Sequence, residues 1–118
     1  EEMPIKSLVT FPASGAKYNF GQKVEVRGNA WSGIGDVKEV FVSIDFGATW
    51  IKSMLKKPKN KFAWQRFSAN LEFPSKGYYE VWARAVDKKG VSQPMVIPGW
   101  NPKGYLNNAT HRIAVKIV

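Results

Sequence analysis

The stretch Val42–Trp50, VSIDFGATW, predicts a tight turn between two β-strands. The residues before the turn, VFVSI, and those after it, TWIKS, are rich in the β-branched and aromatic types that favour strands. Asp45 and Gly47 stand between these runs, and they are residue types that a hairpin connection requires. The stretch therefore predicts a β-hairpin, and the rest of the chain decides which β fold contains it.

The same stretch resembles the Asp-box turn of sialidase-type propeller blades, in its spacing of serine, aspartate, glycine, threonine and tryptophan. A propeller needs at least about four blades of roughly 40–50 residues each. This chain has 118 residues, and the stretch occurs in it a single time. The length therefore argues against a propeller and favours one hairpin of a small sandwich.

Apolar and polar residues alternate with a period of two along most of the chain. Such alternation turns one face of each strand toward a core and the other toward solvent. The runs with this signal are Ser7–Phe11, Lys23–Trp31, Val37–Ile44, Thr49–Ser53, Phe62–Phe73, Gly77–Asp87 and His111–Val118. No helical period interrupts them. The sequence therefore predicts an all-β fold, an immunoglobulin-like antiparallel β-sandwich of about seven strands.

Two tryptophans carry finer expectations. The small Ala83 and Ala85 would let the opposing sheet pack closely, and Trp64 is the candidate residue for that contact. Trp82 falls on the face opposite Val81, among charged residues. Two alternatives are open for Trp82: it belongs to an exposed partner surface, or a loop covers it.

Composition excludes several kinds of site. Hydrophobic residues make up 44% of the chain, which is enough for a core, and cysteine is absent, so that no disulfide or thiolate is available. His111 is the single histidine, whereas a zinc site takes three or four ligands, so we expect no metal site. The sequence offers no nucleophile–base pair, and we expect no catalytic residue.

The ends of the chain and its hydropathy predict no membrane association. No run approaches the ~18–20 apolar residues that a spanning helix needs. The first residues, EEMPIKS, lack the basic and apolar regions of a signal peptide. We expect them to be the cut end of a longer chain.

The net charge of +9 comes from 18 Lys and Arg residues against 9 Asp and Glu residues. This balance is typical of nucleic-acid binders, membrane-surface proteins and receivers of small anions. Most of the clustering lies in Lys52–Lys61, KSMLKKPKNK, where Pro58 and Asn60 indicate an exposed loop. No arginine-rich arm or RNA-recognition signature accompanies it, so we expect a solvated loop and no nucleic-acid partner.

Three segments in one order carry a more specific signal. They are GNAWSGIGDVKEVFVSIDFGATW (Gly28–Trp50), YYEVWARAVDKKGVSQP (Tyr78–Pro94) and WNPKGYLNNATHRIAVKIV (Trp100–Val118). Together they resemble the molybdenum-cofactor oxidoreductase dimerisation domain, the C-terminal domain of sulfite oxidases, from about Ile5 to Val118. The family prefers glycine where this chain has Ile34 and Phe46.

The resemblance implies an early-set immunoglobulin-like sandwich that forms one domain over residues 1–118. It implies that a larger domain holding molybdopterin precedes this one, and that this domain makes the two-fold homodimer contact. The chain would then hold no cofactor and would be no enzyme by itself, while its parent would be a molybdenum-dependent sulfite oxidoreductase. The habit of the family also implies a periplasmic or otherwise exported parent.

The resemblance assigns roles to a few residues. In the WNPKG segment the family carries an arginine where this chain has Lys103, which implies a contact with a small anion such as sulfite at the substrate entrance. Lysine keeps the charge of that arginine but loses its bidentate fork. Residues with an expected structural role in the same segment are Trp100, Asn101, Gly104 and Asn108. The interface candidates are Trp82, His111 and Arg112. The family often has tryptophan where this chain has Thr110.

A second function class stays open. Basic, tryptophan-rich sandwiches also serve as free-standing immunoglobulin-like modules that bind polysaccharide or another protein. A preceding domain with a single cysteine in a molybdopterin-binding context would decide between the two hypotheses in favour of the dimerisation domain.

Overall fold

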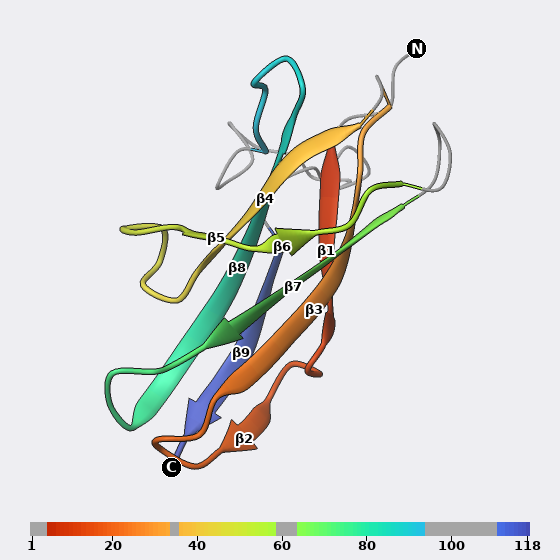
Figure 1. Ribbon diagram of the computed structural model, residues 1–118. Helices are drawn as coiled ribbons and strands as arrows, with labels where there is room; N and C mark the ends of the chain where they lie inside the picture. The colour runs from red at the N-terminus through yellow and green to blue at the C-terminus, as the bar shows by residue number, and fades with distance from the viewer. Residues whose placement is uncertain (1–4, 34–35, 59–63, 94–110) are drawn as a thin grey trace, which may run out of the picture.

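The computed structural model describes residues 5–33, 36–58, 64–93 and 111–118. In this part of the chain the strands are β1 (Lys6–Phe11), β2 (Ala16–Tyr18), β3 (Val24–Trp31), β4 (Val37–Ser43), β5 (Ile51–Lys52), β6 (Met54–Leu55), β7 (Gln65–Leu71), β8 (Gly77–Asp87) and β9 (His111–Ile117). They form a four-stranded sheet of order β1-β3-β7-β6 and a five-stranded sheet of order β2-β9-β8-β4-β5 (Figure 1). The all-β sandwich prediction is confirmed. No helix among the described residues is long and apolar enough to span a bilayer.

The described strands number nine rather than the expected seven, for two reasons. β2 has three residues, too few to show alternation, and it pairs with β9 in parallel rather than antiparallel. The run predicted as one strand, Thr49–Ser53, contains β5 only; the chain then crosses between the sheets at Ser53 and forms β6 just beyond the predicted end. At the crossing, the backbone N–H and the Oγ of Ser53 both donate to the carbonyl oxygen of Val40, at 2.9 and 2.7 Å.

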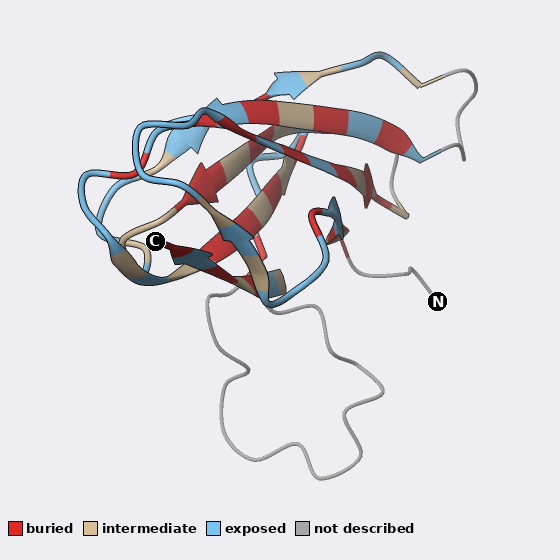
Figure 2. Ribbon diagram, turned by 90° about the horizontal axis from the view of Figure 1, so that it is seen from below, coloured by how far each residue is buried: buried red, intermediate tan, exposed pale blue. Residues whose placement is uncertain are grey.

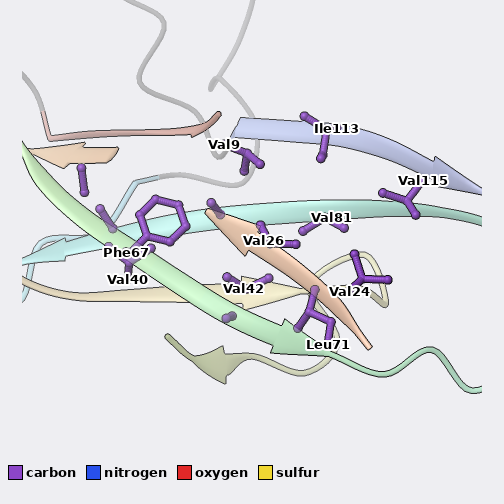
Figure 3. Close-up of a cluster of buried hydrophobic side chains, with 14 of the residues drawn as sticks. Val9, Val24, Val26, Val40, Val42, Phe67, Leu71, Val81, Ile113 and Val115 are labelled. Carbon is purple, nitrogen blue, oxygen red and sulfur yellow. The ribbon is translucent and has the colours of Figure 1, made fainter. Parts of the chain in front are cut away.

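The core lies between the two sheets, and the alternation of buried and exposed residues along the strands is visible in Figure 2. Val24, Val26 and Phe67 of the four-stranded sheet face Val42 and Val81 of the five-stranded sheet (Figure 3). Burying such side chains stabilises the fold by roughly 1.5–3 kcal/mol each. The predicted strand faces are therefore the ones that the tertiary structure uses.

Gly28 on β3 makes room for one of these core side chains. A Cβ at this position would lie 2.2 Å from the carbonyl oxygen of Leu8 and 2.4 Å from Cζ of Phe67. The space that any larger residue would fill is thus already taken by the Phe67 ring.

The expectation that Trp64 packs against Ala83 and Ala85 was wrong. Trp64 is 46% exposed, and its ring lies 6.3 Å from the ring of Trp31 on the outer side of the four-stranded sheet. Phe67, three positions further on, has the opposite parity and fills the core instead.

Several strand ends meet at one end of the sandwich, here called the entry end. Lys6 at the start of β1 is paired with Trp31 at the end of β3, and Val37 at the start of β4 is paired with Asp87 at the end of β8. β9 begins at His111 at this same end, while Val118 and β2 lie at the opposite end (Figure 1). The chain therefore enters the domain at the end from which the segment 94–110 leaves β8 and returns to β9.

Candidate functional site

The residue predicted to bind an anion, Lys103, lies outside the described residues. The same holds for Trp100, Asn101, Gly104, Asn108 and Thr110. The structure does describe the residues on either side of this segment, Gln93 and His111, and both are held by β1.

Gln93 anchors the start of the segment and is only 1% exposed. Its Oε1 accepts hydrogen bonds from the Oγ of Ser7 at 2.6 Å and from the backbone N–H of Ala85 at 2.9 Å. Its own backbone N–H donates to the carbonyl oxygen of Ala85 at 3.1 Å. These bonds satisfy the buried side-chain oxygen and the backbone N–H of Gln93, and they fix the chain between β1 and β8.

His111 anchors the end of the segment. The backbone N–H of Val9, on β1, donates to Nδ1 of His111 at 2.8 Å. An Nδ1 that accepts a hydrogen bond is unprotonated, so the neutral imidazole is the form that fits this geometry. Burial first, and the nearby positive charge of Lys6 second, lower the pKa of His111 and favour the same form. In this chain His111 is a structural acceptor that ties the five-stranded sheet to β1, and its interface role stays a prediction.

Both anchors use the same strand, at positions two residues apart. Ser7 holds Gln93 and Val9 holds His111, so β1 determines where the segment 94–110 starts and where it ends. β1 is also the first strand of the described chain, so both ends of that segment are attached to the strand with which the domain begins.

Trp82 lies on the outer face of the five-stranded sheet but is only 7% exposed. The ring of Phe46 stands edge-on to it, with centroids 6.0 Å apart, and the guanidinium of Arg112 lies 4.1 Å from its ring centroid. Its Nε1–H donates to Oε1 of Glu80 at 3.0 Å. Of the two alternatives for Trp82, this geometry shows the one in which a loop covers the side chain. The interface roles of Trp82 and Arg112 stay predictions.

The loop that covers Trp82 is the predicted hairpin turn. The carboxylate of Asp45 accepts hydrogen bonds from the N–H and the Oγ1 of Thr49, at 2.9 and 2.5 Å, and from the Oγ of Ser43 at 2.7 Å. These bonds, those from Thr49 before that from Ser43, lower the pKa of Asp45 to about 2. The aspartate and serine of the stretch therefore close the turn, and this closure carries Phe46 back over the sheet.

Residues that sequence reasoning did not select complete this face. The guanidinium of Arg84 lies 4.2 Å over the ring of Trp50, and its buried Nε has no hydrogen-bond partner among the described residues. Tyr78, an exposed residue, donates from its hydroxyl to Glu80 at 3.3 Å. We call this surface the aromatic–arginine face; it consists of Phe46, Trp50, Tyr78, Trp82, Arg84 and Arg112. The sequence could have predicted part of this face, because Tyr78, Trp82 and Arg84 alternate with the buried residues of β8 and so point to the same side of the sheet.

The outer face of the four-stranded sheet has a different character. It carries an open hollow of about 900 Å³ whose lining includes Arg27, Lys56 and Arg66. Arg27 lies 4.2 Å over the ring of Phe11 and 3.5 Å from a carboxylate oxygen of Glu25. This second face is therefore concave and mainly basic.

The donor set does not fit a molybdenum centre. The sequence contains no cysteine, and in the ranges that the structure covers no three His, Asp or Glu side chains gather as a metal site requires. The chain thus supplies no ligand set for that cofactor within the described part.

A family model described as the Mo-co oxidoreductase dimerisation domain matches residues 1–118. The chain belongs to this family. Sulfite oxidases are among the relatives of this dimerisation domain: the mouse mitochondrial enzyme is 37% identical over 125 residues, which cover 100% of this chain and 23% of the relative. The Arabidopsis thaliana sulfite oxidase is 32% identical and covers 80% of this chain and 27% of its own length. This chain therefore spans about a quarter of the curated relatives it matches.

Solved structures share the fold of this chain. The sulfane dehydrogenase SoxCD of Paracoccus pantotrophus is 30% identical, with a TM-score of 0.77 over 97% of this chain and 30% of that one. The CARDB domain of the PF1109 protein from Pyrococcus furiosus has a TM-score of 0.64 at 17% identity over 100% of this chain and 90% of that one, which shows a shared fold alone.

The comparisons correct one expectation. The matched sulfite oxidases of mouse, rat and human are mitochondrial proteins. The expectation of a periplasmic or exported parent was therefore wrong, because it followed a habit of bacterial members that these relatives do not share.

Proposed function

We propose that residues 1–118 form one dimerisation domain within a longer molybdenum-dependent sulfite oxidoreductase. The observation that carries the proposal is the match of the whole chain to the dimerisation-domain family, together with relatives named sulfite oxidase that are about four times as long. Molybdopterin, held by the preceding domain, would supply the redox chemistry. This domain supplies no catalytic residue, and its partners are a second copy of itself and the molybdopterin domain.

We further propose that the entry end of the sandwich faces the molybdopterin domain. The chain enters the domain there, and the segment that contains Lys103 starts and finishes at the same end, tied at Gln93 and His111. Sulfite is a small anion, and a cation near its entrance favours entry and binding. In this proposal Lys103 provides that charge.

The test of the dimer is the association state of the full-length protein. Closed two-fold homodimers are the commonest assembly of soluble proteins. Sedimentation equilibrium from low to high micromolar concentration should therefore give twice the monomer mass. A monomer throughout that range contradicts the proposed role, whatever the enzyme's activity.

A further inference from the structure

Phe46 adopts a backbone conformation that its side chain disfavours. Its φ is 58°, and it is the described residue other than glycine with a positive φ. A bulky side chain is uncommon in this left-handed region, which glycine occupies without strain. The Phe46 ring is nevertheless 60% exposed, so core burial does not account for its presence. Strain of this kind is concentrated at functional sites.

The neighbours of Phe46 hold its ring in one orientation. The ring stands at 88° to the indole of Trp82, the geometry that aromatic pairs favour. The indole is in turn fixed by its bond to Glu80 and by the guanidinium of Arg112. The Asp45–Thr49 hydrogen bonds fix the loop backbone. The ring is therefore presented to solvent with little freedom left to lose on binding, which favours affinity.

The surrounding residues are the types that dominate protein–protein contacts. Tryptophan, tyrosine and arginine are enriched at the energetic centres of interfaces. Tyr78 is exposed on this face, and the guanidinium of Arg84 lies 4.2 Å over the ring of Trp50.

We propose that the aromatic–arginine face is the surface on which a second copy of this chain docks, with the Phe46 ring as its anchor. The inference rests on the proposed homodimer and adds which face forms it. On this face Glu80 and Arg112 lie on neighbouring strands, since Trp82 is paired with Arg112. In a two-fold contact, if one residue of the first copy touches a second residue of its partner, the reverse contact forms as well, so Arg112 of each copy can lie against Glu80 of the other.

The opposite face is less suited to the same role. The lining of its hollow includes Arg27, Lys56 and Arg66 against one acidic residue, Glu25, and that carboxylate already lies 3.5 Å from Arg27. Two such faces brought together would oppose like charges, which costs free energy unless anions intervene. The aromatic–arginine face is therefore complementary to a second copy of itself, whereas the face of the four-stranded sheet is not.

The experiment uses sedimentation equilibrium of the full-length protein carrying Phe46→Gly. Glycine suits a φ of 58°, so this variant keeps the turn while it removes the ring. We expect the dimer dissociation constant to rise roughly tenfold or more, as for an interface anchor. Circular dichroism should show the same β structure as the wild type. Phe20→Ala, which removes another half-exposed phenylalanine that is not part of this face, should leave the constant unchanged.

The remaining outcomes separate the two proposals. If the wild type is a dimer and Phe46→Gly leaves its dissociation constant unchanged, the assignment of the face is wrong while the dimerisation role stands. Weakening by Phe11→Ala in place of Phe46→Gly would assign the contact to the four-stranded sheet and overturn the inference. A wild type that is monomeric overturns the proposed homodimer itself.

Discussion

The Oγ of Ser7 donates a 2.6 Å hydrogen bond to Oε1 of Gln93, although 86 positions separate the two residues in the sequence. Ser7 belongs to the four-stranded sheet, whereas Gln93 follows the last turn of the five-stranded sheet. Both side chains are buried, and the same Oε1 also accepts the N–H of Ala85. The bond therefore joins the two sheets at the entry end. It also fixes Gln93, the residue that directly precedes the segment 94–110.

Replacing Gln93 by leucine should destabilise the protein. The substitution keeps a side chain of similar size but leaves the buried N–H of Ala85 without its acceptor. An orphaned buried donor costs about 1–3 kcal/mol. The free energy of unfolding in urea would measure the loss. Gln22→Leu is the matched control, since Gln22 is exposed and its change should stay within about 0.5 kcal/mol; equal effects at both positions would contradict the role of the Ser7–Gln93 contact.

The stability of the protein should fall as the pH drops below about 6.5, the ordinary pKa of histidine. The pKa of His111 is lowered in the folded protein, so the unfolded chain takes up a proton at a higher pH than the folded chain does. Stability from this group is thus complete above the unfolded pKa, declines as the pH falls toward the folded pKa, and then levels off. Urea unfolding between pH 7.5 and pH 5 would show the slope.

His111→Asn provides the control for this slope. The Oδ1 of asparagine can accept the N–H of Val9 in place of Nδ1, but it does not titrate. No other histidine is present in the chain, so this variant should lose the pH dependence near pH 6. An unchanged slope would show that His111 is not its source.

Gly28→Ala should be destabilised by about 1–3 kcal/mol or more, the cost of overpacking a core. The new methyl group would lie far inside contact distance of the Phe67 ring and of the Leu8 carbonyl. Adding Phe67→Leu should recover part of the loss, because it removes the ring but not the backbone clash. Thermal unfolding of the two variants and of Phe67→Leu alone would test this; full additivity of the two substitutions would contradict it.

Lys103→Ala in the full-length enzyme should weaken sulfite binding. Losing one charge-assisted contact costs roughly 1.5–3 kcal/mol, which corresponds to about ten- to a hundredfold in affinity. The loss should appear mainly in KM if the charge assists the ground state and the transition state alike. Steady-state kinetics at fixed ionic strength would measure it.

Two further variants serve as controls for Lys103→Ala. Lys103→Arg should retain activity, since it restores the fork that favours an oxyanion. Lys57→Ala, at an exposed lysine of the basic loop, should leave KM unchanged. Equal KM values for the wild type, Lys103→Ala and Lys57→Ala would remove Lys103 from the substrate entrance.

The sequence by itself determined the features that depend on near neighbours along the chain. The period-two alternation, as in Val24 and Val26 of β3, indicated the fold class. It also determined the buried face of each long strand, because a slip of one residue would turn that face outward. The Asp45 turn followed from the seven consecutive residues Ser43–Thr49. Three segments in a fixed order along the chain indicated the family.

Only the tertiary structure decided the features that depend on contacts between distant residues. The crossing at Ser53, the parallel pairing of β2, the cover that Phe46 places over Trp82, and the attachment of Gln93 and His111 to β1 had no local signal. Alternation states which way a side chain points, but it does not state which strand, loop or sheet lies there. Trp82 and Trp64 show this: each lies on an outward face, yet one is covered by a hairpin loop and the other is left half exposed, because only the packing of the folded chain brings a loop over the first.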